Sequence, residues 1–76
     1  KKVSTITVNQ KMMYRVGENS VIIDLSDSIT LEDVKAIALL KPMTVIFYED
    51  GFEDDNVKIN AEVILKDHGV EDVRSI

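Results

Sequence analysis

Five carboxylates within seven residues form the densest group of chemically capable side chains in this 76-residue chain. They are Glu49, Asp50, Glu53, Asp54 and Asp55. Hard divalent cations bind carboxylate oxygens, so such a cluster could form a metal site. A calcium-binding loop of the EF-hand type, however, places glycine at its sixth position, whereas Gly51 directly follows Asp50. We therefore expect no metal site, and interpret the acids as solvated caps of a following helix, whose dipole favours negative charge there.

The other groups that could do chemistry are isolated from one another. His68 is the only histidine, and no serine has a plausible base beside it in the sequence. We expect His68 to interact with the negative end of a helix dipole. The three glycines are too widely spaced to form a phosphate-binding loop. The sequence thus predicts no catalytic, cofactor-binding or metal-binding residue.

The charge balance disfavours direct binding to DNA. Fourteen acidic and nine basic side chains give a net charge of -5, the wrong sign for contacts with phosphates. Four basic residues nevertheless fall within the first fifteen positions, namely Lys1, Lys2, Lys11 and Arg15. A DNA-contacting accessory domain therefore stays open as an alternative, with solvated strand ends as the simpler interpretation.

Size and composition indicate a single small domain over residues 1–76. A chain of this length can bury only one modest core, and 45% hydrophobic residues are too many for intrinsic disorder. No apolar run is long enough to span a membrane, and cysteine is absent, so we expect a cytoplasmic location. Because the chain begins with Lys1 rather than methionine, we expect it to be a piece of a longer protein.

The first half of the chain predicts three strands and a helix. Residues 3–8 and 12–16 are β-rich and read as a hairpin, and a third strand follows at residues 21–25. Thr30 and Asp33 form an approximate capping box, with Ile29 and Val34 as a hydrophobic staple. The helix should span residues 31–41, where Pro42 ends it by restricting the residue before it.

The second half predicts a strand, a helix and a last short strand. The apolar run of residues 43–48 is typical of a central strand that is covered on both faces in a parallel sheet. A turn at Asp50-Gly51 leads to a helix over residues 54–68, with Gly69 as its left-handed cap. The helix offers acid-first pairs of Asp54 with Lys58 and of Glu62 with Lys66. The fold class is therefore α/β, with α+β as an alternative: a mixed sheet of about five strands with two helices, in the order β-β-β-α-β-α-β. Right-handed crossovers make the later strands parallel.

The second helix is apolar on two sides. Its main apolar stripe can pack on the sheet, while Ile59 and Val63 lie on roughly the opposite face. A chain of 76 residues has little material to cover both, so we expect Ile59 and Val63 to contact another domain or subunit. Lys58 and Asn60 could donate hydrogen bonds to the same partner, although Lys58 could instead pair with Asp54. Coverage by the amino-terminal hairpin, or partial exposure, is the alternative.

The segment from Pro42 to Ile76 resembles the carboxy-terminal end of the modification subunits of type III restriction-modification systems. The resemblance depends on an apolar strand followed by Asp50, Gly51, Phe52, Asp55, Lys58 and Asn60, and on the closing residues 69–76. Lys1 to Lys41 agrees with that family in general character only. The resembled subunits are adenine-specific DNA methyltransferases that use S-adenosylmethionine, flip the target base and act with a restriction subunit.

The resemblance implies a non-catalytic domain of such an enzyme. The family's Asp-Pro-Pro-Tyr and Phe-x-Gly-x-Gly motifs are absent, since Pro42 is the only proline and the glycines stand apart. We expect an assembly or positioning domain that itself binds no S-adenosylmethionine and meets DNA only through the parent complex. Its partners would be the rest of the methyltransferase chain, a second modification subunit or the restriction subunit. An independent small ligand-binding or regulatory domain is the alternative from another class.

Overall fold

The structure, a computed structural model, describes residues 2–18 and 20–76. Its elements are β1 (Val3–Val8), β2 (Lys11–Val16), β3 (Val21–Asp24), α1 (Leu31–Leu39), β4 (Thr44–Phe47), the short 3₁₀ helix η1 (Glu49–Gly51), α2 (Asp55–Asp67) and β5 (Asp72–Ser75). The predicted order β-β-β-α-β-α-β is confirmed. The turn predicted at Asp50-Gly51 is the 3₁₀ helix η1.

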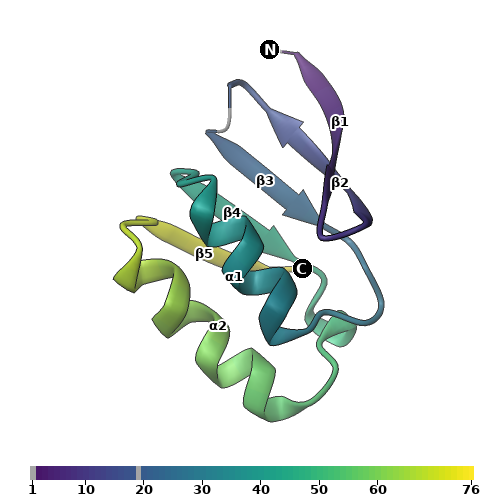
Figure 1. The fold of residues 1–76 in the computed structure, drawn as a ribbon, viewed down its shortest axis with the longest axis vertical. Helices are drawn as coiled ribbons and strands as arrows, with labels where there is room; N and C mark the ends of the chain where they lie inside the picture. Colours follow the sequence, from purple (N-terminus) through teal and green to yellow (C-terminus); the bar gives the residue numbers. More distant parts are fainter. Residues whose placement is uncertain (1, 19) are drawn as a thin grey trace.

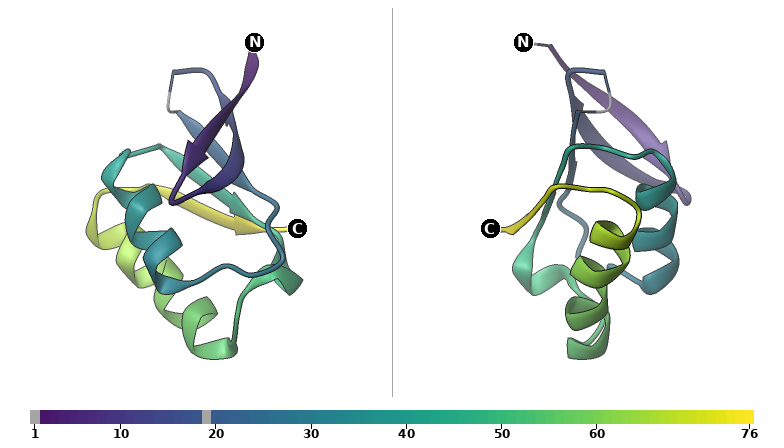
Figure 2. Two further views of the ribbon diagram at one scale, coloured as in Figure 1. Left: turned by 45° about the vertical axis from the view of Figure 1, so that its right-hand side comes forward. Right: turned by 90° about the vertical axis from the view of Figure 1, so that its left-hand side faces the viewer.

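The five strands form one mixed sheet in the order β1-β2-β3-β4-β5. β1, β2 and β3 are antiparallel neighbours, whereas β3, β4 and β5 are parallel, as predicted. Successive right-handed crossovers that advance in one direction place their helices on the same side of a sheet. Accordingly, α1 and α2 lie side by side against one face, and the other face carries no helix (Figures 1 and 2).

The hairpin between β1 and β2 has a tight two-residue turn. Asn9 and Gln10 have φ angles of 52° and 67°, the left-handed pair that two-residue hairpins favour because its twist matches the strands. Lys11 therefore belongs to β2, paired with Val8, although the sequence predicted a strand start at Met12. This shift of one residue leaves the predicted shared face of Met12, Tyr14 and Val16 unchanged.

The first helix is shorter than predicted at its carboxyl end. Its start is the expected capping box, in which the Thr30 hydroxyl accepts from the Asp33 amide and the Asp33 carboxylate accepts from the Thr30 amide. The helix ends at Leu39 rather than at residue 41, because Lys41 takes a left-handed φ of 51° and donates its amide to the Ala38 carbonyl. Pro42 was predicted to restrict Lys41, but Lys41 does not have the extended backbone that a following proline favours.

The second helix has a defined cap at each end. The Asp54 carboxylate accepts from the Val57 amide at 3.0 Å, so Asp54 is the N-cap of α2. At the other end Gly69, with φ 92°, donates to Lys66, and the Val70 amide donates to the Leu65 carbonyl. This pattern is a Schellman motif, and its usual apolar contact is available because Leu65 and Val70 are both buried.

The core lies between the helices and one face of the sheet. Met13, Ile22, Val45 and Phe47 project from the strands into it, and each is at most 1% exposed. The next residues along β4 are only half-buried, because no element covers the other sheet face. The expectation that residues 43–48 are covered on both faces is therefore wrong: periodicity cannot reveal that both crossovers lie on one side. Neither α1 nor α2, the α-helices of the described residues, has the length and hydropathy that a bilayer-spanning helix requires.

Candidate functional site: two apolar surfaces and a buried polar cluster

The sheet face without helices is largely apolar over its middle strands, and we call it the open sheet face. Strand register places its side chains in rows. The central row is Thr5, Tyr14, Ile23, Ile46 and Arg74, and a neighbouring row is Val3, Val16, Val21, Thr44 and Asp72. A third row begins with Thr7 and Met12, and Leu25, Tyr48 and Ile76 continue the alternation just beyond β3, β4 and β5.

Large apolar side chains on the open sheet face are substantially exposed. Val3 is 62% exposed, Met12 63%, Leu25 46%, Tyr48 41% and Ile76 68%. Parallel strands normally occur in sheets that are covered on both faces, and large exposed apolar patches mark interaction sites. The sequence did not predict this surface, because an apolar run such as residues 43–48 is compatible with one covered face or two.

Charge is confined to one edge of the open sheet face. Among the strand residues on this face, only Asp72 and Arg74 are charged, and both belong to β5 at the edge of the sheet. They form an ion pair with each other, with Arg74 Nε 2.7 Å from Asp72 Oδ2. The middle strands therefore present an uncharged surface, and the edge pair adds no net charge.

The second apolar surface is the pair Ile59 and Val63 on α2, which we call the α2 patch. These side chains are 69% and 64% exposed, so neither the sheet nor the hairpin covers them. Their contact with a partner stays a prediction. By helical spacing, the charged residues one turn away from the patch are Asp55, Glu62, Lys66 and Asp67, so its border has an excess of acids.

Lys58 and Asn60, which we predicted to contact the same partner, have local partners within the chain. Lys58 Nζ lies 3.4 Å from Glu49 Oε1, not against Asp54, because the Asp54 carboxylate is occupied as the cap of α2. The Asn60 amide group donates to the Asn56 carbonyl at 2.7 Å. The other predicted helical pair is confirmed, with Lys66 Nζ 3.3 Å from Glu62 Oε2.

Of the remaining positions of the family-like motif, Gly51 and Phe52 serve the fold. Gly51 is buried, and a Cβ there would lie 2.1 Å from the Ser26 carbonyl oxygen, so only glycine fits. Phe52 packs on Phe47, with ring centroids 5.1 Å apart. Backbone hydrogen bonds from Ile29 to Gly51 and from Glu53 to Ile29 join this segment to the loop before α1. Asp50 and Asp55 are exposed, in η1 and at the first position of α2.

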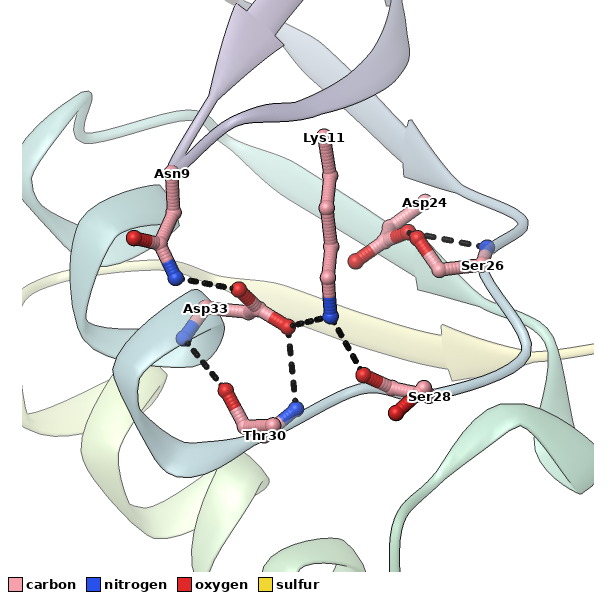
Figure 3. Close-up of polar contacts among 7 residues, drawn as sticks. All are labelled: Asn9, Lys11, Asp24, Ser26, Ser28, Thr30 and Asp33. Atoms are coloured by element: carbon pink, nitrogen blue, oxygen red, sulfur yellow. Dashed lines mark hydrogen bonds and ion pairs between the residues drawn. The ribbon is translucent and has the colours of Figure 1, made fainter.

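A buried polar cluster joins the hairpin turn to the start of α1 (Figure 3). The Asp33 side chain is fully buried and accepts hydrogen bonds from Asn9 Nδ2 at 2.5 Å, Lys11 Nζ at 2.5 Å and the Thr30 amide at 3.0 Å. Lys11 also donates to the Ser28 carbonyl. Burial raises the pKa of the Asp33 carboxyl, but these hydrogen bonds and the Lys11 charge outweigh burial and hold the pKa below its ordinary value of 3.8.

A second buried carboxylate, Asp24, lies at the end of β3. Its Oδ1 accepts from the Ser26 amide at 3.0 Å and from the Ser26 hydroxyl, whereas Oδ2 has no hydrogen-bond partner among the described residues. These hydrogen bonds are thus local, whereas Asp33 is paired with Lys11. The contacts of the buried polar cluster are internal, and they occupy Lys11, which was one of the basic residues of the DNA-binding alternative.

The described residues offer no enclosed place for a small ligand. No cavity is present among residues 2–18 and 20–76, and they contain no group of three or more acidic, histidine or cysteine side chains placed to bind a metal ion. His68 is exposed at the end of α2, with Nδ1 2.9 Å from the Ile64 carbonyl oxygen. The features that stand out are therefore surfaces.

Comparison with known proteins adds no relative: no family model, no curated protein and no solved structure matches this chain.

Proposed function

We propose that this chain is a non-catalytic assembly domain. The observation that carries the proposal is the open sheet face, where apolar side chains from β1 to β4 and from Ile76 remain without a covering layer. Burying such a surface is favourable by about 25 cal/mol for each Å² of apolar area. We therefore expect this face to contact another protein surface. The α2 patch supplies a second, smaller contact on the opposite layer.

We further propose that the parent is the modification subunit of a type III restriction-modification system, an adenine-specific DNA methyltransferase. Support comes from the resemblance over residues 42–76. In that setting the catalytic part of the enzyme binds S-adenosylmethionine and DNA in the cytoplasm, and this domain holds subunits together or positions them. DNA contact by the domain itself would have to overcome its net charge of -5.

The two apolar surfaces suit different partners. The border of the α2 patch holds three acids and Lys66, which pairs with Glu62, so the patch favours a partner surface that places basic residues around an apolar centre. We assign this contact to the rest of the methyltransferase chain or to the restriction subunit. The open sheet face, uncharged over its middle strands, favours an apolar partner without such a requirement.

The parent assignment is tested first in the reading frame that encodes this chain. Upstream of Lys1, we expect codons for an Asp-Pro-Pro-Tyr type motif and a Phe-x-Gly-x-Gly type motif in the same frame. An initiator methionine directly before Lys1 would exclude the methyltransferase parent and favour an independent binding domain.

The assembly role is tested by binding in trans. The 76-residue chain would be mixed with the methyltransferase polypeptide that lacks it, and complex formation and adenine methylation would be measured. We expect the double variant Ile59→Lys, Val63→Glu to lose binding, while the matched control Lys35→Glu, at an exposed position of α1, retains it. Unchanged binding of the double variant would exclude the α2 patch as the binding surface. No binding by the unmodified chain would refute the proposed assembly role.

A further inference from the structure

We propose that the outer edge of β1 binds an extended segment of a partner protein. The segment adds to the sheet as a further strand, antiparallel to β1, and carries acidic residues at its carboxyl end. The inference rests on the proposed assembly function and deepens it, because it names the chemistry by which a partner attaches. β1 is the outermost strand at the end of the sheet opposite β5 (Figure 1).

The backbone of β1 presents hydrogen-bonding groups at alternate residues. Residues that flank a two-residue turn exchange both of their backbone hydrogen bonds, so Val8 and Lys11 form a hydrogen-bonded pair. The alternation along an antiparallel pair then turns the amides and carbonyls of Val3, Thr5 and Thr7 away from β2. In the described part of the chain, no hydrogen bond to these groups is present. An incoming strand would therefore find donors and acceptors along the whole edge.

The two edges of the sheet differ in the features that normally prevent strand addition. Proteins protect edge strands by keeping them short or by placing charges, prolines or bulges on them. β5 has four residues and carries the charged pair Asp72 and Arg74. β1 has six residues, nearly all of them β-branched, without charge or proline, and its register with β2 is continuous. The β1 edge is therefore the one suited to accept another strand.

Charge identifies the kind of segment that suits the β1 edge. The first seventeen residues hold four basic side chains and no acid, whereas all fourteen acids come later in the sequence. Lys11 is paired with Asp33 at the turn of the hairpin. Lys2 and Arg15 lie at the opposite end, where Lys2 precedes β1 and Arg15 is paired with Ser4 in the register. An antiparallel segment places its carboxyl end there, so acidic residues at that end are electrostatically favoured.

The side chains along the β1 edge favour an uncharged centre in the bound segment. Side chains of an added strand alternate between the two faces of the sheet. On the helical side they would lie beside Ser4 and Ile6, and Ile6 is only partly buried against the core. On the open sheet face they would lie beside Thr5 and Thr7, which are exposed. β-branched residues fit both surfaces, while main-chain hydrogen bonds supply affinity, as in other cases of strand addition.

A second copy of this chain suits the β1 edge less well than an acidic segment does. Pairing of β1 with its own copy would bring together two hairpins that each carry basic residues and no acid. Their like charges would oppose the contact, whereas a segment that ends in acids would offset the charge of the hairpin.

The test measures binding of a fluorescently labelled synthetic peptide, Thr-Val-Thr-Val-Thr-Val-Asp-Asp, to the 76-residue chain by fluorescence anisotropy. We expect saturable binding, and slower hydrogen exchange of the Val3, Thr5 and Thr7 amides in the complex. Thr5→Pro removes an outward amide that makes no bond to β2, so it should weaken binding by about tenfold or more and leave the hairpin folded.

The matched control for Thr5→Pro is Ser75→Pro at the other edge of the sheet. The Ile76 amide donates to the Phe47 carbonyl, so by alternation the Ser75 amide points away from β4. Ser75→Pro should therefore bind the peptide as the unmodified chain does. Circular dichroism checks that both variants fold.

Two altered peptides test the proposal without any change in the chain. Replacement of Asp-Asp by Lys-Lys should weaken binding by about fivefold at low salt, and the difference should shrink at about 1 M salt. Two prolines at the centre of the peptide should abolish binding, because they remove its main-chain donors and its extended pairing.

Several results would overturn the proposal: no binding of the acidic peptide, equal binding of the basic peptide, or equal losses in Thr5→Pro and Ser75→Pro. Self-association that Thr5→Pro abolishes would also overturn it, because the edge would then belong to a second copy. If the acidic peptide does not bind but the chain still binds the methyltransferase polypeptide that lacks it, strand addition is excluded and the assembly function stands.

Discussion

Lys11 in β2 and Asp33 in α1 form an ion pair with Nζ and Oδ2 2.5 Å apart, although 22 residues separate them in the sequence. The pair connects the amino-terminal hairpin to the helical layer. Asn9, held in the hairpin turn by its left-handed backbone, donates to the other oxygen of the same carboxylate. Asp33 therefore acts twice, as a partner of the N-cap of α1 and as the anchor of the hairpin.

Removal of the Lys11 charge should destabilise the fold. Lys11→Met leaves the Asp33 carboxylate buried without its cationic partner. We expect a loss of about 2 kcal/mol in the free energy of unfolding. This is less than the roughly 3–5 kcal/mol lost when a fully buried pair is broken, because the Lys11 side chain is 30% exposed. Urea denaturation at neutral pH measures the loss. The control is Lys66→Met, which breaks the exposed pair with Glu62 and should cost about 0.5 kcal/mol or less. Equal losses in both variants would show that the buried pair stabilises the fold no more than the exposed pair does.

Acid should weaken the same anchor. The folded pKa of Asp33 is lowered, so its stabilising contribution is complete above the unfolded value and disappears as the pH falls through the folded pKa. The stability difference between the unmodified chain and Asp33→Asn should be constant above about pH 5 and shrink below about pH 4. Urea midpoints between neutral pH and pH 2 check this. Asp67→Asn, at the exposed end of α2, should not differ from the unmodified chain in this way.

Substitution of Gly51 should be far more harmful than substitution of Gly69. A Cβ at Gly51 meets the Ser26 backbone oxygen at 2.1 Å, so Gly51→Ala forces apart the η1 segment and the loop before α1. We expect a loss of about 3 kcal/mol or failure to fold. Gly69 has open space around it, and Gly69→Ala meets only the strain of a left-handed backbone, about 1 kcal/mol. Thermal unfolding of both variants provides the comparison, and similar midpoints would contradict the proposed clash.

Neutralisation of Asp24 should have the opposite effect to removal of Lys11. Asp24 Oδ2 is buried without a hydrogen-bond partner among the described residues, so the desolvation of that oxygen is not offset by a hydrogen bond. Asp24→Asn keeps an oxygen that can accept from Ser26 while it removes the buried charge. We expect unchanged stability or a gain of about 1 kcal/mol. A large loss in urea denaturation would mean that the Asp24 charge stabilises the fold, contrary to this interpretation.

Much of the fold follows from local signals, because caps and periodicity act over a few residues. Thr30 and Asp33 mark the start of α1 in the sequence, and Asp54 and Gly69 mark the limits of α2. The errors also have local causes. A left-handed Asn9-Gln10 turn lengthened β2 to Lys11, and a left-handed Lys41 shortened α1. Asparagine adopts this conformation more readily than most residues, but glutamine and lysine do not, so the residue types at positions 10 and 41 did not indicate it.

Of the two candidate surfaces, one could be predicted from the sequence and the other could not. The exposure of Ile59 and Val63 follows from helical spacing, since the main stripe of α2 must face the sheet. The open sheet face could not be predicted, because an apolar run such as residues 43–48 is equally compatible with one covered face or two.

The sequence by itself determined the order of strands and helices, their caps and the absence of the methyltransferase motifs, since these depend on residue types and short spacings. Only the tertiary structure decided that both helices cover one face, that Lys11 reaches Asp33 and that Gly51 touches Ser26. These contacts depend on which strands become neighbours and on the edge of the sheet to which each successive strand is added. Sheet order is set by the packing of the whole chain, so no single segment specifies which apolar face remains uncovered.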